Sequence, residues 1–380
     1  MGIVRLLLAL TVVVGHANRP EWFPIVRGEY AVEMFFVISG FYMAMVLNEK
    51  YLPVPSAAKA YRLFVKSRAL RLLPVYLVVL TATLIVQLVW ARTGANPNTQ
   101  AFGSIPPALL FWKQNHLNPA SILLLAGSNL LILGQDAVMY LRVNTHGALS
   151  FTTNFGAAPL AAWRFLLLPQ AWSLGIEALF YLLAPLLVRR SVPVIAGAAL
   201  GSLALRSLLR HYGLVDDPWS YRFFPSELHL FLLGALGYRA YRRLRAKQAF
   251  RPWQGVFALA AAITMITFCW HTRLWHHPDL PKLLFAAAVP FIFALTRTNA
   301  VDRWLGELSY PLYVVHILVI QAVRFAGCAS LHVTVLWSLA AAVFLMLAVD
   351  QPFERLRQGW IARRKGLSPI LRPQTAASVN

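Results

Sequence analysis

Acidic residues are scarce in this chain. Its 380 residues include 14 Asp and Glu against 35 Lys and Arg, which gives a formal net charge of +21. Charged residues of both signs make up only 13% of the sequence, whereas 58% of the residues are hydrophobic. A soluble protein of this size could not keep so much apolar surface out of water. The composition therefore excludes an ordinary soluble protein and predicts an all-α, polytopic bundle of transmembrane helices.

Cysteine is rarer still. Cys269 and Cys328 are the only two, and neither belongs to a CxxC pair or has the spacing of metal ligands. This excludes a disulfide framework and a zinc site of the usual kind. His271, His276 and His277 lie in a predicted outer loop, but no cluster of acidic ligands accompanies them. We expect no bound metal and no permanently bound cofactor.

The excess of positive charge first suggests nucleic acid as a partner. The basic residues, however, gather in short segments between apolar runs, namely Lys59–Arg71, Arg189–Arg190, Arg239–Arg251 and Arg355–Lys365, with a weaker one at Arg297–Arg303. Such clustering is typical of the cytoplasmic loops of membrane proteins. We therefore expect contacts with membrane lipids and not with nucleic acid, in the inner (plasma) membrane, with both termini cytoplasmic.

Eleven apolar runs are long enough to be considered as helices. They lie near residues 3–17, 30–47, 69–91, 119–134, 171–188, 192–208, 226–240, 253–270, 281–296, 307–325 and 331–349.

If alternate basic loops are cytoplasmic, one of these runs does not cross the membrane, and the short run 119–134 and the stretch 156–169 are the candidates. We therefore predict about ten transmembrane helices within a single domain over residues 1–365. Residues 92–118 and 135–160 are predicted loops, and residues 366–380 a disordered polar tail.

The first run places two basic side chains at its ends. Arg5 and His16 are separated by ten apolar or small residues, and eleven helical positions return within roughly 20° of the same face. A charge within an apolar helix is costly unless it has a partner or a task. The same segment also fits a cleavable signal peptide, although further apolar runs follow it. We predict one helix that carries Arg5 and His16 at different depths along one wall.

The second run contains a carboxylate, Glu33, followed by Ser39 and Gly40. An acid inside a span usually faces the bundle interior and pairs with a cation, so Glu33 is either functional or part of a structural ion pair. Ser39 and Gly40 are small enough to let another helix approach closely, and packing is the simpler explanation for both.

A cationic patch opens the third run. Arg62, Lys66, Arg68 and Arg71 lie within ten residues, and Arg68 and Arg71 share a helix face. Because arginine binds phosphate through two parallel hydrogen bonds, two arginines on one face suit a diphosphate. The alternative is a simple topology anchor on the cytoplasmic side.

Later runs also mix polar groups with apolar sequence. Trp172 and Glu177 open the fifth long run, and Arg222 precedes the run at 226–240. Tyr313 and His316 are three residues apart and therefore share a face. Glu177 could orient or neutralise an imidazole, whereas a single histidine such as His316 is usually a packing residue.

These segments together resemble a known family. The spacing of Arg5 and His16 is similar to the opening signature of the integral membrane acyltransferase-3 family. Five further segments match in order, and the chain closes the match with DQPFER at 350–355. The five segments are EMFFVISGF, FVKSRALRLLPVY, WSLGIEALFYLL, FLLGALGY and LGELSYPLYVVH.

The resemblance implies a function. Members move acyl groups, usually acetyl from cytoplasmic acyl-CoA, onto hydroxyls of carbohydrates such as O-antigen, exopolysaccharide, peptidoglycan and lipid-linked sugars. It implies that Arg5 and His16 are important and that Arg68 and Arg71 serve the donor. The chain departs from the family in having Glu177-Ala178 where many members have two glutamates, and in lacking Asp-Gly before Arg5. We see no room for an appended esterase-like domain.

The expected mechanism follows from these residues. Arg68 and Arg71, together with Arg5, hold the phosphates of acyl-CoA, and Arg62 and Lys66 are further donor-binding candidates. His16 acts as general base on the acceptor hydroxyl, oriented by Glu177 or Glu33, or forms a transient acyl-histidine.

Two other functions remain open at this point. Intramembrane Arg5, Glu33 and Glu177 could be the coupling relay of a secondary transporter, although no inverted repeat is evident. A lipid- or glycan-binding scaffold without enzymatic activity is the third possibility.

Overall fold

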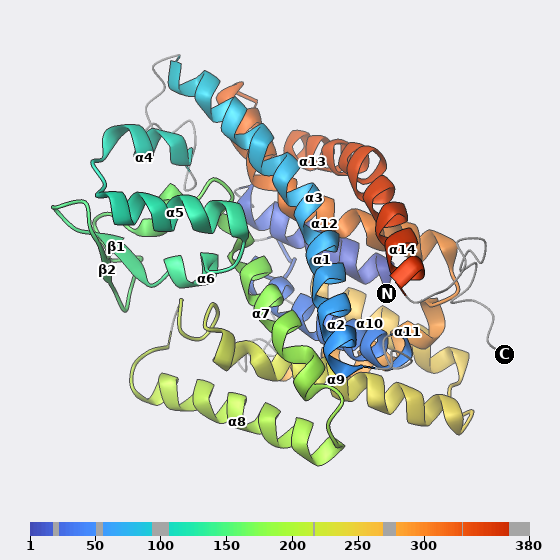
Figure 1. The fold of residues 1–380 in the computed structure, drawn as a ribbon. Coiled ribbons are helices and arrows are strands. Elements are labelled where there is room, and N and C mark those ends of the chain that lie inside the picture. Colours follow the sequence, from blue (N-terminus) through green and yellow to red (C-terminus); the bar gives the residue numbers. More distant parts are fainter. Residues whose placement is uncertain are drawn as a thin grey trace.

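The computed structural model describes residues 1–17, 23–50, 56–92, 106–215, 217–268, 279–328 and 330–364, which form an almost entirely helical bundle (Figure 1). Each of the eleven predicted apolar runs coincides with a helix. These helices are α1 (Gly2–His16), α2 (Gly28–Glu49), α3 (Ala57–Arg92), α5 (Pro119–Leu131), α7 (Trp172–Leu187), α8 (Val192–His211), α9 (Phe224–Ala246), α10 (Pro252–Thr267), α11 (Leu280–Thr296), α12 (Ala300–Phe325) and α13 (Leu331–Leu345).

Helix α13 runs through a π-helical turn, Met346–Asp350, into α14 (Gln351–Arg364). The predicted tail 366–380 lies outside the described residues, as do Cys269 and the histidines at 271, 276 and 277.

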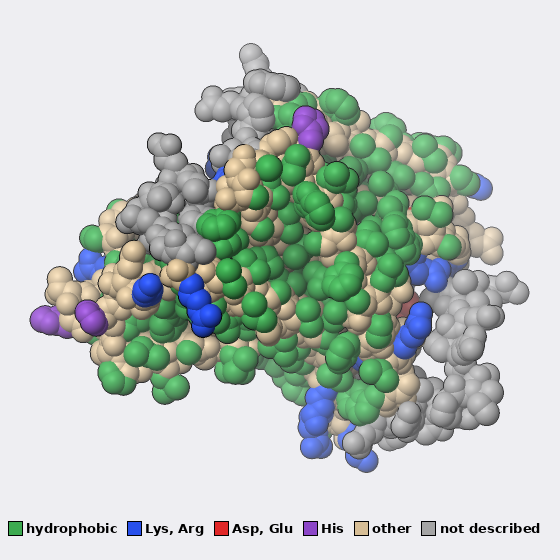
Figure 2. All heavy atoms as spheres, turned by 90° about the horizontal axis from the view of Figure 1, so that it is seen from above, with side chains coloured by type: hydrophobic (Ala, Val, Ile, Leu, Met, Phe, Trp, Pro, Cys, Tyr) green, Lys and Arg blue, Asp and Glu red, His purple; other side chains and the backbone are tan. Residues whose placement is uncertain are grey.

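The surface confirms an all-α membrane protein. Within the described ranges, six helical segments are long and apolar enough to cross a membrane, and α1, α5, α10 and α11 are shorter apolar helices. Large apolar side chains point outwards, with 76% of Leu123, 70% of Phe257 and 67% of Leu336 exposed. Figure 2 shows a face made mostly of hydrophobic side chains, with basic side chains towards its edges. Such a surface requires lipid. The count of ten spans stays a prediction.

The two predicted loops contain regular structure, so that part of the prediction was wrong. Helix α4 (Ala108–Gln114) lies in the first. The second holds α6 (Gln135–Val138) and a hairpin in which β1 (Leu141–Val143) pairs antiparallel with β2 (Leu149–Phe151). These elements gather at one side of the bundle (Figure 1). Segments of three to seven residues are too short to show a hydrophobic period.

Neither candidate for a non-crossing run is a full-length span. Helix α5 has 13 residues and rises about 20 Å, short of the roughly 30 Å of a bilayer core. The stretch 156–169 is irregular apart from a 3₁₀ turn at Ala162–Phe165.

The helices α2 and α9 cross with their backbones in direct contact. A Cβ at Gly40 would overlap the backbone of Phe231, and a Cβ at Gly234 would overlap the backbone of Val37. Close approach of this kind is how membrane helices gain packing energy without a hydrophobic driving force. The packing interpretation therefore fits Gly40 but does not account for Ser39, whose hydroxyl donates to Glu177 at 2.6 Å. The crossing holds α2, which carries Glu33 and Ser39, in a fixed position.

The crossing gives a stability prediction. Gly40→Ala should force α2 and α9 apart and destabilise the protein by about 1–3 kcal/mol, as overpacking does. Gly197→Ala on α8 is the matched control, because open space surrounds that position and alanine favours helix by about 1 kcal/mol. We expect a lower thermal midpoint in detergent for Gly40→Ala and an equal or higher one for Gly197→Ala. Equal midpoints in both variants would contradict this account of the crossing.

Candidate functional site

Helix α1 packs against α12 at a point where each helix has a glycine. Gly2 faces Gly306, and a Cβ on Gly2 would overlap the backbone carbonyl of Asp302. The Asp302 carboxylate accepts hydrogen bonds from the amides of Gly2 (2.7 Å) and Ile3 (2.9 Å). The first amides of a helix have no partner within it, so Asp302 caps α1 from the neighbouring helix. This contact fixes the depth of Arg5 and His16 in the bundle.

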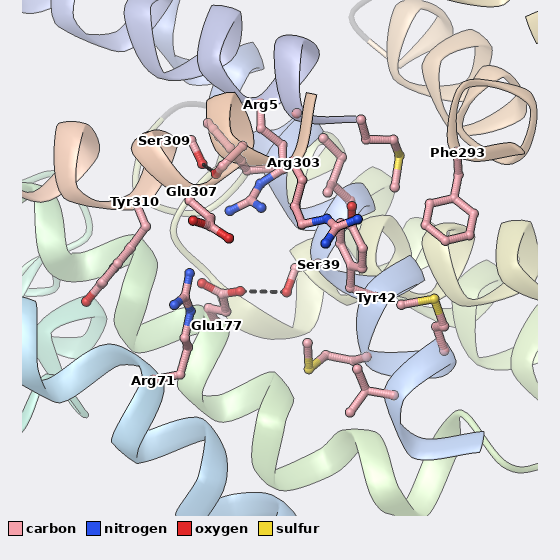
Figure 3. Close-up of a pocket in the computed structure, with 18 of the residues that line it drawn as sticks. Arg5, Ser39, Tyr42, Arg71, Glu177, Phe293, Arg303, Glu307, Ser309 and Tyr310 are labelled. Carbon is pink, nitrogen blue, oxygen red and sulfur yellow. Dashed lines mark hydrogen bonds between the residues drawn. The ribbon is translucent and has the colours of Figure 1, made fainter. Parts of the chain in front are cut away.

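A first cavity of about 580 Å³ lies beside this contact. Its lining comes from α1, α2, α3, α7, α9, α11, α12 and the turn between the last two. Figure 3 shows Arg5, Arg71 and Arg303 extending toward its centre from three different helices. Six arginines line the cavity: Arg5, Arg68, Arg71, Arg245, Arg297 and Arg303. Because they outnumber the acids around them, the cavity favours an anionic ligand.

Glu177 projects from α7 into the first cavity (Figure 3). One of its oxygens accepts hydrogen bonds from the Ser39 hydroxyl (2.6 Å) and the Tyr181 hydroxyl (2.6 Å). The Glu177 carboxylate is therefore positioned by two hydroxyls, and these bonds do not connect it to His16. The expectation that Glu177 orients the imidazole does not agree with this arrangement.

Arg71 is held by the segment that closes the family resemblance. Its Nη1 lies 3.1 and 3.0 Å from the two carboxylate oxygens of Asp350 and 3.7 Å from Glu354. The π-helical turn at the end of α13 brings Asp350 to this position. The guanidinium is thus oriented at the cavity wall before any ligand binds.

The four predicted donor-binding residues divide into two pairs. Arg68 and Arg71 line the first cavity, and the Arg68 guanidinium lies 5.9 Å from the centre of the Phe64 ring. Arg62 and Lys66 are exposed on α3 and line neither the first cavity nor a second one around His16.

A second, smaller cavity of about 270 Å³ surrounds His16. Trp172 and Tyr221 form part of its wall, with ring centres 4.7 Å apart. The Arg222 guanidinium lies 4.3 Å from the Trp172 ring centre, and its Nε donates to Asp217 at 2.6 Å. Burial lowers the pKa of Arg222, but the charge and hydrogen bond of the Asp217 carboxylate, together with Tyr221 and Tyr313, raise it, so this pKa lies above its ordinary value. Trp172 and Arg222 therefore belong to the same cavity as His16.

His16 is paired with His316, 300 residues away. Nδ1 of His316 lies 2.6 Å from the carbonyl oxygen of Tyr313, and a carbonyl only accepts, so we assign a proton to that Nδ1. The bare Nε2 of His316 then faces Nδ1 of His16 at 3.3 Å, which also bonds the Val12 carbonyl at 2.9 Å. This pattern leaves the lone pair of His16 on Nε2. His316 thus orients His16 and is more than a packing residue.

Glu33 belongs to a separate buried network. Its Oε1 accepts hydrogen bonds from Arg206 of α8 (2.9 Å) and from Lys282 of α11 (2.8 Å), and Arg206 also pairs with Glu227 (2.7 Å). Glu33 is only 3% exposed and lines neither described cavity. The structural ion-pair interpretation fits this geometry, and the alternative in which Glu33 orients His16 does not.

Three of the six cavity arginines were missed from sequence: Arg245, Arg297 and Arg303. Arg245 was counted only as part of a topology-setting basic segment, and the other two flank the short turn between α11 and α12. Their common signal was that both segments lie on the predicted cytoplasmic side, next to the patch that holds Arg68 and Arg71. Sequence could not show that they line the same cavity.

Comparison with known proteins agrees with the motifs. A family model described as an acyltransferase domain, Acyl_transf_3, matches residues 1–350. No curated protein and no solved structure matches the chain. The matched region contains both cavities, from the Gly2 contact of α1 to the Asp350 partner of Arg71. Since the match covers most of the chain, the protein belongs to the acyltransferase-3 family and is a membrane acyltransferase.

Proposed function

We propose that the protein transfers an acyl group, acetyl in our expectation, from cytoplasmic acyl-CoA to a hydroxyl of an exported or cell-surface carbohydrate. One observation carries the proposal: an arginine-lined cavity and a histidine-containing cavity meet at a shared side chain, Tyr313. The first has the charge that a coenzyme A phosphate needs, and the second has a positioned base. These are the two requirements of acyl transfer between substrates on opposite sides of a membrane.

The donor binds in the first cavity. Arginines on several helices can bind a diphosphate and a 3′-phosphate from different directions. Arg245 lies at the end of α9, Arg297 directly after α11 and Arg303 near the start of α12. All three are on the side of the bundle that carries the basic segment Arg239–Arg251. The positive-inside rule makes that side cytoplasmic, where acyl-CoA is available.

The acceptor binds in the second cavity. Trp172 and Tyr221 offer aromatic faces, on which the apolar face of a sugar ring can rest. Arg222, Glu29 and Gln170 provide polar groups that can hydrogen-bond its hydroxyls. An acceptor hydroxyl in this cavity lies on the same side of the bundle as Nε2 of His16.

The chemistry follows from the tautomer of His16. Nε2 accepts the proton of the acceptor hydroxyl as its oxygen attacks the acyl carbon. The carbon–oxygen bond forms, the carbon–sulfur bond breaks, and the thiolate of coenzyme A takes up the proton that His16 received. His316 keeps the Nδ1 proton of His16 in place through the 3.3 Å contact, so that Nε2 stays free to act.

The transporter alternative draws on the same two cavities, since solute sites that open to opposite sides also occur in transporters. Family membership favours the enzyme. Purified protein that releases coenzyme A from acetyl-CoA in the presence of envelope carbohydrate supports the enzyme. Carbohydrate or acetyl-CoA uptake without any thioester cleavage would support the transporter.

The role of His16 gives the first activity prediction. His16→Ala should lower acetyl transfer from labelled acetyl-CoA to envelope carbohydrate by about 10²–10⁴, the usual contribution of a general base. His332→Ala is the matched control, because His332 is exposed on α13 and lines neither cavity of the described residues. If His16→Ala inserts normally and keeps more than about a tenth of the wild-type rate, the base is another group.

The donor cavity gives a second prediction. Arg68→Lys and Arg71→Lys should raise the Michaelis constant for acetyl-CoA about ten- to a hundredfold, because lysine loses the planar fork that binds phosphate and each such contact contributes about 1.5–3 kcal/mol. The acceptor constant should not change. Arg62→Lys is the control, since Arg62 lies on the same helix but outside the cavity. If all three variants have the same Michaelis constant for acetyl-CoA, Arg68 and Arg71 do not bind the donor and serve only to set the topology.

Orientation can be tested with cysteines in a background that carries Cys269→Ser and Cys328→Ser. Ala246 follows Arg245 of the first cavity and is exposed, whereas the exposed Ala157 lies near Phe155, whose ring contacts Arg222 of the second cavity. An impermeant thiol reagent added outside intact cells should label Ala157→Cys and should leave Ala246→Cys unlabelled until the cells are opened. The reverse pattern would invert the proposed direction of transfer.

A further inference from the structure

The two cavities are separate in the structure but share part of their wall. Among the described residues, Val32 of α2 and Tyr313 of α12 alone line both. Val32 is a short side chain close to its own helix, whereas Tyr313 has a long side chain with two rotatable bonds. The separation of the cavities therefore depends on the position of one aromatic ring.

The phenol group of Tyr313 is held at the boundary by one partner on each side. Its hydroxyl lies 2.6 Å from the Ser173 hydroxyl, which faces the first cavity. It also donates to the carbonyl oxygen of Gln170 at 3.0 Å, and Gln170 faces the second cavity. The ring packs near Phe35 and His316, with ring centres 6.5 and 5.7 Å away. Only 8% of Tyr313 is exposed, so the ring fills the boundary and does not stand in open space.

We infer that Tyr313 is a movable partition between the two cavities. With its hydroxyl on Ser173 and Gln170, the ring separates the arginine-lined cavity from the cavity that holds His16. When the ring rotates about its first side-chain bond, these two hydrogen bonds break and the cavities join. Tyr313 is thus a positioning residue, and the structure shows its closed arrangement.

The catalytic meaning of this partition rests on the proposed function. A thioester in the first cavity is kept apart from water in the second cavity until the ring moves. Without the ring, a water oxygen could attack the acyl carbon, the carbon–sulfur bond would break, and the products would be the free carboxylic acid and coenzyme A thiol. The partition therefore favours transfer over hydrolysis.

Accessibility tests the partition without any assay of activity. The reporter is Ser39→Cys, a nearly isosteric change in the first cavity, in the background with Cys269→Ser and Cys328→Ser. The probe is the small impermeant anion (2-sulfonatoethyl) methanethiosulfonate, whose charge suits the arginine-lined cavity, added from the side on which the second cavity opens. Ala157→Cys reports that the reagent reaches that side. We expect slow labelling of Ser39→Cys with Tyr313 intact.

Three partition variants extend the test. Tyr313→Ala should make Ser39→Cys accessible from the second-cavity side. Tyr313→Phe keeps the ring but loses both hydrogen bonds, and should raise the labelling rate roughly thirtyfold, the ratio expected for losing two ordinary hydrogen bonds of about 1 kcal/mol each. Ser173→Ala removes one bond and should give a smaller rise. Tyr310→Phe is the matched control, because Tyr310 lines only the first cavity and donates instead to the Leu72 carbonyl.

Two labelling results would contradict the inference. Labelling of Ser39→Cys that is equally fast with and without the Tyr313 ring would overturn the inference, as would slow labelling in every Tyr313 and Ser173 variant. If Tyr313→Ala does not fold, Tyr313→Phe and Ser173→Ala decide on their own. An enzyme assay then distinguishes this inference from the proposed function. A partition that responds as predicted in a protein that never cleaves acetyl-CoA would uphold the inference and reject the function.

Discussion

The close contact of α1 with α12 is the interaction on which the whole site depends. Gly2 and Gly306 bring the two helices together, and Asp302 holds the start of α1 in register. From that point the helices rise side by side at about 1.5 Å per residue, so Arg5 enters the first cavity and His16 reaches the second, about 16 Å further on. The same register brings His16 opposite His316. A shift of one helical turn would break the histidine pair and move Arg5 away from the arginine-lined cavity.

Lipid explains why the remaining charges lie where they do. A charge in contact with hydrocarbon is costly, so each buried ionisable side chain turns inward to a partner or to a cavity. Glu33 satisfies this rule through Arg206 and Lys282 and has no contact with either cavity, whereas Arg71 has a carboxylate partner and also lines a cavity. An intramembrane charge alone therefore does not mark a functional residue. The useful criterion is whether a side chain with its partner still faces space that a substrate can occupy.

Sequence was sufficient for the long apolar helices and insufficient for the short elements and for the contacts between helices. Apolar runs of fifteen residues or more locate the spans, because the demand for internal hydrogen bonding in lipid leaves few alternatives. The hairpin at Leu141–Phe151 was missed because its strands have three residues each. The partner of His16 was missed for another reason: no local pattern connects residues 300 positions apart. The sequence identified Arg5, His16, Glu177 and Tyr313 as candidates, from the residues and from the motif resemblance. That Arg5 and Glu177 line one cavity, His16 the other and Tyr313 both follows only from the three-dimensional packing.

The division between the cavities also explains how the proposed reaction can be selective without a tight fit to either substrate. Glu177, on the donor side, already accepts two hydroxyl hydrogen bonds, and the free nitrogen of His16 lies beyond Tyr313. A bound thioester therefore meets the base only after the boundary opens. An acceptor bound against Trp172 and Tyr221 occupies the same cavity as the base, so its hydroxyl is the nucleophile nearest to His16 when the ring moves. In the proposed reaction, selectivity then arises because the boundary delays the meeting of thioester and base, and an acceptor that binds during this delay is the first nucleophile to reach the acyl carbon.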